Sequence, residues 1–470
     1  VLQQVKQAFD PQGIFNPHKI VDVLPMDTDL RYPPGYQTYE IPTALSFKRE
    51  QGYVRAAEFC NGAGACRKSH MAQGGMCPSY QATLEERNST RGRANVLRKS
   101  IAKYGPRDAF KSHELHETMN LCLECKLCKS ECPSNVDMAK LKYEYLQRRR
   151  DIVGTNLSEL AVAFMPTLTR LGVPFFFLFN WLVRYRWGRV LFEKLARIDA
   201  RRDIPKITFP TLRLWFRFWH RPHPNAGTNG KTVHFLADPF INYNEPHVGM
   251  AAIRVLEAAG YRVELSKVRD DGRTLISKGF TRRAKNLAER NLWTLRSAME
   301  RGIPLIGVEP STILTLRDEY RDFFPGDPAA ALVAQNTYMI DEFLVQQATQ
   351  NDLKLRLKTL HQEVLVHGHC FQKALASVDT TLQMLELIPG LSACAIPSGC
   401  CGMAGSFGYD KDKYDVSMKV GELVLFPAVR KREGKTVLAV GTSCRHQIYE
   451  GTEYQAKHPI EMLAEAMVDD

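Results

Sequence analysis

The sequence predicts two fold classes in one chain, an all-α part that carries cysteines and an α/β part that follows it. Three observations support this prediction. The 470 residues correspond to about three domains at ~150 residues each. Seven of the 12 cysteines lie among helical stretches between residues 55 and 150. From Lys231 onward, short apolar runs alternate with helical stretches, which is typical of strands joined by helices.

Four segments precede the α/β part. Residues 1–22 are expected to form a helix and a turn, because Val1, Val5 and Phe9 recur at near-helical spacing and a Pro-Gln-Gly sequence then ends the pattern. The next three segments are expected to be a linker, a helical cysteine-rich domain and a basic, aromatic helical segment, at residues 23–54, 55–150 and 151–230.

The α/β part is expected to have two halves, residues 231–350 and 351–470. A helix over Val248–Ala259 is ended by Gly260, because glycine commonly ends helices. Buried strands are expected at four apolar runs, which are Val233–Ala237, Ile303–Val308, Val364–Val366 and Val437–Val440.

The composition is that of an ordinary globular protein, with 44% hydrophobic and 24% charged residues, and it excludes wholesale disorder. The net charge of +12 permits nucleic acid, an anionic membrane surface or an acidic partner. No nucleic-acid-binding fold is recognised, so nucleic acid is not expected. Neither a signal peptide nor an initiator Met is seen, which predicts a piece of a longer, cytoplasmic protein.

The cysteines are expected to bind metal rather than to form disulfides, because they are clustered and no secretion signal is visible. The strongest motif is Cys122-x2-Cys125-x2-Cys128-x3-Cys132-Pro133. Such spacing lets one loop place three thiolates around an iron–sulfur cluster while the fourth reaches a second cluster. Zinc is a poorer fit, since zinc ligands usually come as separated pairs.

A partner motif, Cys60-x5-Cys66-x10-Cys77-Pro78, precedes it, with Ala63 at the position where a further cysteine is expected. By crossed ligation, Cys77 would join Cys122, Cys125 and Cys128 around one [4Fe–4S] cluster. The second set would then be Cys60, Cys66 and Cys132. Three cysteines can hold [3Fe–4S], or [4Fe–4S] with another ligand, for which His70 is a candidate.

A third set lies near the C-terminus and comprises Cys370, Cys400, Cys401 and Cys444. Adjacent cysteines rarely form a disulfide with each other. Each cysteine follows or borders an expected strand, and loops at the carboxyl ends of strands are where α/β sheets usually build sites. A four-sulfur site is therefore expected, with buried structural thiols or a redox disulfide as the alternative. Cys394 fits no motif and is expected to be a small core residue.

Residues 55–145 resemble the helical ferredoxin-type domain of bacterial 2-hydroxyacid dehydrogenases of the glycolate oxidase and D-lactate dehydrogenase group. The resemblance lies in the Cys60–Lys68, Met76–Tyr80 and Asn88–Ala94 motifs. Residues 351–470 resemble the cysteine-rich CCG domain of these proteins and of heterodisulfide reductases, which implies a cubane or non-cubane cluster there. These proteins usually carry the CCG domain twice.

A weak internal repeat fits this pattern, because residues 234–250 parallel residues 365–380. Asp270-Asp271-Gly272 then aligns with Cys400-Cys401-Gly402, Thr312 with Cys444, and Phe240 roughly with Cys370. We expect a first CCG repeat without cysteines that acts as a scaffold for the second. Nearby His367, His369 and His446 are expected to hydrogen-bond to thiolates or backbone.

The basic, aromatic segment has two open interpretations. Residues 160–183 carry one charge, Arg170, but Pro166 and Pro174 interrupt the stretch, so a membrane span is not favoured. Arginines interleaved with Trp and Phe suit a peripheral helix on an anionic membrane, on the inner face of the cytoplasmic membrane. They also suit a helical layer packed between domains.

Residues 9–19 resemble the end of the FAD-linked oxidase domain of flavin-dependent 2-hydroxyacid dehydrogenases, so FAD is expected upstream in the parent protein. The resemblances imply an oxidoreductase that oxidises D-lactate, glycolate or D-2-hydroxyglutarate at FAD. This chain would relay the electrons through [4Fe–4S] clusters to quinone or another acceptor. Alternatives are a heterodisulfide reductase-like subunit, or an electron-transfer subunit for a separate flavoprotein. No catalytic residue for the substrate is expected here.

Overall fold

A computed structural model describes residues 1–28, 30–32, 35–72 and 74–468. It divides into two compact units, Val1–Glu40 and Ile41–Asp470. The first unit contains helix α1 (Leu2–Phe9), which confirms the expected helix. The turn after α1 is held by Asp10, whose carboxylate accepts hydrogen bonds from the backbone N–H groups of Ile14 and Phe15.

The predicted linker at 23–54 includes residues 29, 33 and 34, which lie outside the described residues. Its last part does not form a free linker, because residues 41–54 belong to the second compact unit. Leu45 and Phe47 are buried there, and the Phe47 ring packs edge-on against Tyr53. The hydrophobic effect therefore draws this stretch into the core of the cysteine-rich domain.

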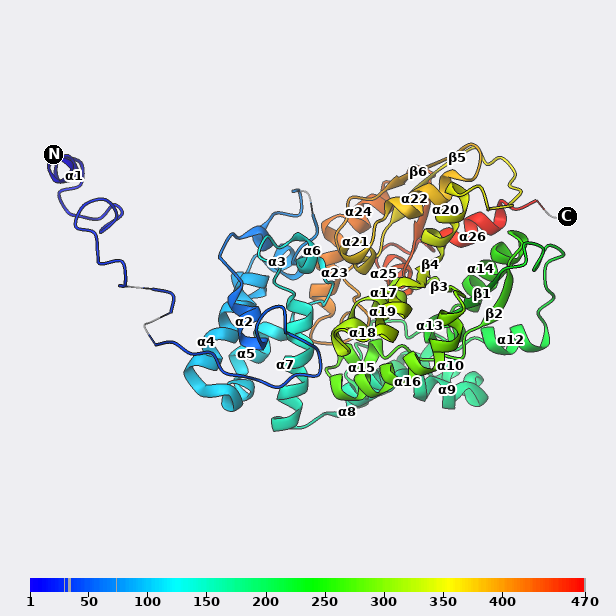
Figure 1. Cartoon of the computed structure of the whole chain (residues 1–470), viewed down its shortest axis with the longest axis horizontal. Helices are drawn as coiled ribbons and strands as arrows, with labels where there is room; N and C mark the ends of the chain where they lie inside the picture. Colours follow the sequence, from blue (N-terminus) through cyan, green and yellow to red (C-terminus); the bar gives the residue numbers. More distant parts are fainter. Residues whose placement is uncertain (29, 33–34, 73, 469–470) are drawn as a thin grey trace. The chain divides into compact units, whose positions relative to one another are not determined.

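The cysteine-rich domain is all-helical, as predicted (Figure 1). Polar side chains fix where its longer helices begin: Ser89 caps α4, and Asp137 caps α7. Its α-helices are α2 (Tyr53–Glu58), α3 (Pro78–Thr83), α4 (Thr90–Asp108), α5 (His113–Asn120), α6 (Leu127–Glu131) and α7 (Met138–Val153). Short 3-10 turns lie at Ala65–Arg67, Glu86–Asn88 and Ala109–Lys111.

The basic, aromatic segment is also helical. It contains α8 (Leu157–Ala163), α9 (Met165–Gly172), a 3-10 turn (Val173–Phe175), α10 (Phe176–Arg184), α11 (Arg186–Ala196) and α12 (Leu212–Phe218). No single helix in the described part of the chain is long and apolar enough to cross a membrane. Residues 157–163 and 165–184 reach that length and composition only together, and they meet at a bend of 73°.

The rest of the chain contains two small parallel sheets, which makes the protein mixed α/β. The first sheet has the order β2-β1-β3-β4 and the second the order β6-β5-β7. In each, the first strand in sequence lies between the second and the third. Four central or buried strands match the predicted apolar runs: β1 (Thr232–Phe235), β3 (Leu305–Gly307), β5 (Gln362–His367) and β7 (Thr436–Ala439).

Three strands were not predicted, and they are β2 (Arg262–Leu265), β4 (Thr337–Met339) and β6 (Leu391–Ala395). All three lie at sheet edges. The prediction that Cys394 is a core residue is wrong, because it lies on edge strand β6 with its side chain exposed. A lone cysteine in an apolar run does not show which face of an edge strand it occupies.

Helices surround both sheets. Those of the first half are α13 (Pro239–Tyr243), α14 (Pro246–Ala258), α15 (Arg273–Ser277), α16 (Thr281–Glu300), α17 (Pro310–Arg317), α18 (Glu319–Phe323), α19 (Pro328–Gln335) and α20 (Ile340–Thr349). Those of the second half are α21 (Cys370–Leu375), α22 (Asp379–Glu386), α23 (Tyr414–Leu423), α24 (Leu425–Arg430), α25 (Thr442–Thr452) and α26 (Pro459–Glu465). Helix α14 confirms the expected helix before Gly260. One hydrophobic core runs through both halves and includes Val233 of β1 and Val364 of β5.

Candidate metal centres

A pocket in the cysteine-rich domain is lined by four cysteines, Cys77, Cys122, Cys125 and Cys128. Cys77 immediately precedes α3, whereas the other three lie in the loop after α5 and in the first turn of α6. These are the four cysteines that crossed ligation predicts for one cluster. The structure brings them together around one pocket.

The loops around this pocket are tightly curved. Cys77, Glu124 and Lys126 have positive φ angles of 57°, 58° and 61°, in the left-handed region that side-chain-bearing residues rarely adopt. Such a conformation costs on the order of 1–3 kcal/mol and persists where the surrounding structure requires it. Here it keeps the cysteines of a short loop directed at the same pocket.

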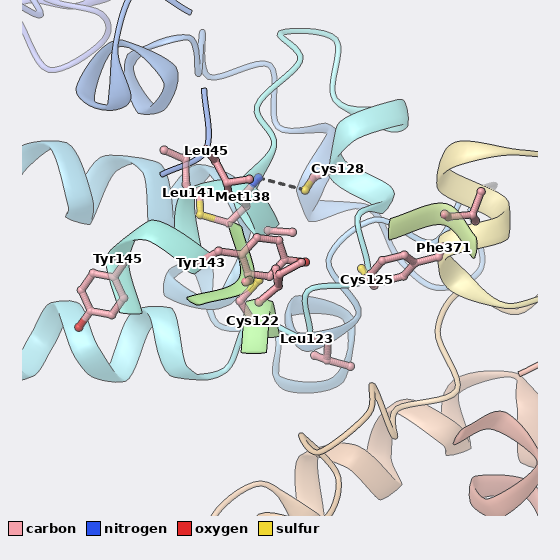
Figure 2. Close-up of a cluster of buried hydrophobic side chains, with 14 of the residues drawn as sticks. Leu45, Cys122, Leu123, Cys125, Cys128, Met138, Leu141, Tyr143, Tyr145 and Phe371 are labelled. Carbon is pink, nitrogen blue, oxygen red and sulfur yellow. Dashed lines mark hydrogen bonds between the residues drawn. The ribbon is translucent and has the colours of Figure 1, made fainter. Parts of the chain in front are cut away.

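Backbone N–H groups point at two of these sulfurs. The amide of Thr90 donates to Cys77 Sγ at 3.1 Å, and that of Met138 donates to Cys128 Sγ at 3.3 Å (Figure 2). Both donors are the first residues of helices, α4 and α7. A helix N-terminus carries partial positive charge, which stabilises a thiolate. The surroundings of these sulfurs therefore fit cluster ligands, because hydrogen bonds to sulfur are common in iron–sulfur sites.

Three of these thiols, Cys77, Cys125 and Cys128, have pKa values above the usual value for cysteine. Burial is the main cause that raises the pKa values of Cys125 and Cys128. The hydrogen bond with Cys66 is the main cause that raises the pKa of Cys77. Since iron binds thiolate, metal binding must displace the protons of these thiols.

The other predicted set, Cys60, Cys66 and Cys132, lies in the same domain. Cys60 and Cys66 are buried, and Cys132 is half-buried at the end of α6. The hydrogen bond from Cys77 lowers the pKa of Cys66 to about 6, so the two predicted sets adjoin at this pair. His70, the candidate extra ligand, is exposed and lines a separate pocket with Gly399 and Cys400.

The third set lies at the edge of the second sheet where the carboxyl ends of its parallel strands meet. Cys370 begins α21 just after β5, Cys400 and Cys401 follow β6, and Cys444 is the third residue of α25 after β7. All four thiols are buried. Each of the four thiols acts on the pKa of at least one other, so the four sulfurs are neighbours. The structure thus gathers the four cysteines that the sequence predicts for this site.

A histidine joins this third set. His367 ends β5, is fully buried, and has a ring nitrogen that lies with the sulfurs of Cys401 and Cys444 within 4.8 Å of one another. Burial is the main cause that lowers the pKa of His367 to about 4, so the ring is neutral at pH 7. His369 instead caps α21 by accepting from the amide of Phe371 at 3.1 Å. His446 lies 3.9 Å from Glu245.

The first half contacts this site through carboxylates. Glu309, which follows β3, accepts a hydrogen bond from the amide of Thr442 at 2.9 Å, at the start of the helix that carries Cys444. Glu245 accepts a hydrogen bond from the Thr442 hydroxyl at 2.8 Å and also pairs with Arg445. These contacts fix the position of α25.

Positions in the first half mirror the cysteine positions. Phe240 is the second residue of α13 after β1, and Asp271 lies between β2 and α15. Thr312 is the third residue of α17 after β3, just as Cys444 is the third residue of α25 after β7. Burial raises the pKa of Asp271 to about 7. Residues 231–350 contain no cysteine, so this half offers no thiolate ligand.

The first and third cysteine sets lie close together. Helix α6, which contains Cys128, packs against α21, which begins at Cys370. Figure 2 shows Phe371 of α21 reaching toward Cys125, and the charge on Cys370 acts on the pKa of Cys125. At a second point, Gly75 and Gly399 touch through their backbones, since a Cβ on Gly75 would lie 2.6 Å from Gly399 Cα. Only glycines allow two cysteine loops to come this close.

No role was predicted from the sequence for Lys126, which lies there between Cys125 and Cys128. Its side chain is 1% exposed and forms ion pairs with Asp318 and with Glu319, the latter at 2.8 Å. Glu319 also pairs with Arg273 at 2.6 Å. A lysine between cysteines in a loop is normally solvated, and only the position of α18 shows that it is buried.

The comparisons with known proteins agree with this chemistry. A family model described as a 4Fe-4S dicluster domain matches residues 59–137. D-2-hydroxyglutarate dehydrogenase of Escherichia coli strain K12 is 26% identical over 99% of this chain and 49% of its own length. The enzyme of that name from Pantoea ananatis is 25% identical over 99% of this chain and 48% of its length. The chain thus spans about half the length of these relatives.

A third relative is covered more completely. The C subunit of anaerobic glycerol-3-phosphate dehydrogenase from Escherichia coli strain K12 is 30% identical over 71% of this chain and 83% of its own length. The dicluster match and this similarity agree on an iron–sulfur protein. The chain belongs to the same family as the C subunit of anaerobic glycerol-3-phosphate dehydrogenase.

Proposed function

We propose that this chain relays electrons from a flavin-dependent dehydrogenase through three iron–sulfur clusters. The observation that carries the proposal is the packing of α6 against α21, which brings the first and third cysteine sets together. Electron transfer between clusters requires such closeness.

The first cluster is assigned to Cys77, Cys122, Cys125 and Cys128, as a [4Fe–4S] cluster. The second is assigned to Cys60, Cys66 and Cys132, which lack a fourth cysteine and so suit [3Fe–4S] or a [4Fe–4S] cluster with another ligand. The third is assigned to Cys370, Cys400, Cys401 and Cys444. In this assignment residues 351–470 are a CCG-type repeat that binds a cluster, and residues 231–350 are a CCG-type repeat that serves as its scaffold.

The source of electrons is proposed to be FAD, in an upstream domain of the same parent protein or in a separate flavoprotein subunit. The substrate class is a 2-hydroxy acid, of the D-lactate, glycolate or D-2-hydroxyglutarate type. Two relatives are named D-2-hydroxyglutarate dehydrogenase, which supports this class. The acceptor is proposed to be a quinone or another one-electron or two-electron carrier.

The test uses the 470-residue chain with its clusters assembled anaerobically. We expect reduced flavin or dithionite to bleach its iron–sulfur absorbance, and D-lactate, glycolate and D-2-hydroxyglutarate each to leave it unchanged. Removal of hydride from a hydroxy acid is flavin chemistry, and residues 1–22 fall short of the ~40 residues that a small domain needs. Substrate-dependent bleaching by the chain alone would contradict the proposal.

We also propose that the basic, aromatic segment contacts the surface of a membrane, on the inner face of the cytoplasmic membrane. Its helices expose large apolar side chains, among them Leu171 at 67%, Phe177 at 62% and Trp187 at 53%. Exposed Arg184 and Arg186 lie between these residues, and neither forms an ion pair with the described residues. Apolar side chains flanked by unpaired cations suit an anionic bilayer surface.

Binding to vesicles tests this contact. The chain should sediment with vesicles that contain phosphatidylglycerol and much less with phosphatidylcholine alone, because ~1 kcal/mol per basic residue comes from anionic lipid. Trp181→Ala with Trp187→Ala should weaken sedimentation several-fold. Trp293→Ala is the matched control, since Trp293 is 81% exposed on α16 in another part of the chain. Equal loss in the control, or no sedimentation of the native chain, would rule out the contact.

A further inference from the structure

The third cysteine set contains a donor that is not sulfur. His367 is 0% exposed, and its Nε2 atom has no nitrogen or oxygen hydrogen-bond partner among the described residues. A buried polar nitrogen without a partner costs free energy, of the order of 1–3 kcal/mol. Such an atom in a folded protein calls for an explanation, and an absent ligand is one.

The tautomer of His367 follows from its other nitrogen. Nδ1 lies 2.7 Å from the hydroxyl oxygen of Ser398, and that hydroxyl lies 3.5 Å from the carbonyl oxygen of Ile396. If the serine hydroxyl donates to this carbonyl, its oxygen accepts the proton of Nδ1. On this basis we assign the tautomer that carries its proton on Nδ1, which leaves Nε2 with a free lone pair. Metal-binding histidines are typically held in this way through the second ring nitrogen.

The lone pair lies among the cluster thiols. The ring nitrogen of His367 and the sulfurs of Cys401 and Cys444 lie within 4.8 Å of one another, and all three residues are buried. Imidazole and thiolate together are known iron–sulfur ligands, as in centres where histidine replaces cysteine. The site therefore presents five donors where a cubane cluster has four irons to bind.

We propose that His367 binds iron through Nε2 in the cluster held by the third cysteine set, beside Cys401 and Cys444. The inference rests on the proposed cluster at that site. A neutral imidazole that takes the place of one thiolate on an iron makes the cluster less negative, which raises its reduction potential. Among the proposed clusters, the third would then be the better electron acceptor, consistent with a place late in the relay.

The experiment uses the full chain, grown with ¹⁵N-labelled histidine and loaded with clusters anaerobically. Pulsed EPR of the reduced protein should show a ¹⁵N coupling of the strength expected for iron-bound imidazole. His367→Cys should keep the iron, lose the coupling and lower the midpoint potential of one cluster. His369→Asn is the matched control, because asparagine also caps helices, and it should keep the coupling.

The outcomes separate this inference from the proposed function. Iron bound at the third set without histidine coupling, or coupling that survives in His367→Cys, would overturn the role of His367 alone. If Cys401→Ser left the iron content of the native chain unchanged, no cluster would be bound there, and both proposals would fail. His367→Ala gives a second variant, which should lose the coupling even if it holds less iron than the native chain.

Discussion

Cys125→Ser is expected to remove one iron–sulfur cluster and to leave the cluster of the third cysteine set in place. Cys125 lines the pocket with three other thiols. The backbone of its loop cannot readily rearrange to supply another ligand, because Glu124 and Lys126 already have left-handed conformations. A serine hydroxyl is a poor ligand for the iron of such clusters, whose soft ligand is thiolate. The loss should be ~4 iron atoms per chain, measured by iron and sulfide analysis together with EPR.

Two further variants make this result specific. Cys401→Ser should do the reverse, removing the signal of the third set and leaving that of the first. Cys394→Ser should change neither, because Cys394 is exposed on β6 and belongs to no set. Loss of both signals in Cys125→Ser would show that the two sites cannot assemble separately, and it would contradict the assignment of independent ligand sets.

Lys126→Met is expected to lower the free energy of unfolding by ~3–5 kcal/mol, the usual cost of removing one partner from a buried ion pair. Lys126 is 1% exposed, and its loss leaves Glu319, also 1% exposed, and Asp318 with fewer partners. Urea unfolding followed by fluorescence measures the change. Lys411→Met is the control, since its 3.7 Å pair with Glu193 is partly exposed and should contribute ~0–1 kcal/mol.

The same ion pairs make the free energy of unfolding depend on pH in a definite direction. Burial alone would raise the pKa of Asp318, but Lys126 and Lys129 outweigh it and hold that pKa below its usual value. The stabilisation is therefore present above the pKa of Asp318 in the unfolded chain and is lost as pH falls, from about pH 5 downward. Lys126→Met should reduce this acid-side loss. Two results would contradict the role given to Lys126. One is a free energy of unfolding that decreases with acid as steeply in Lys126→Met as in the native chain. The other is a decrease of under ~1 kcal/mol on substitution at pH 7.

The sequence predicted the parts of the structure that local patterns determine. β1, β3, β5 and β7 are recognisable because buried parallel strands are short apolar runs. β2 and β6 lie at sheet edges, where one face is open and the apolar run is broken by residues such as Glu264 and Ser392. Cysteine spacing predicted which thiols line the first pocket, since one short loop supplies three of them.

Contacts between distant segments could not be predicted in this way. The burial of Lys126 depends on α18, about 190 residues further along the chain, and no local pattern signals it. The sequence placed His367 near Cys370, but not the free Nε2, because the ring is oriented by Ser398, which is 31 residues away. The contact of Gly75 with Gly399 likewise depends on how two segments far apart in the chain meet.

That glycine contact bears on how the protein matures. The loops carrying Cys77 and Cys400 are adjacent to the two glycines, and both cysteines are buried once the backbones touch. We therefore expect iron and sulfide to reach these cysteines before the two loops close on each other, so that cluster insertion precedes the last step of folding.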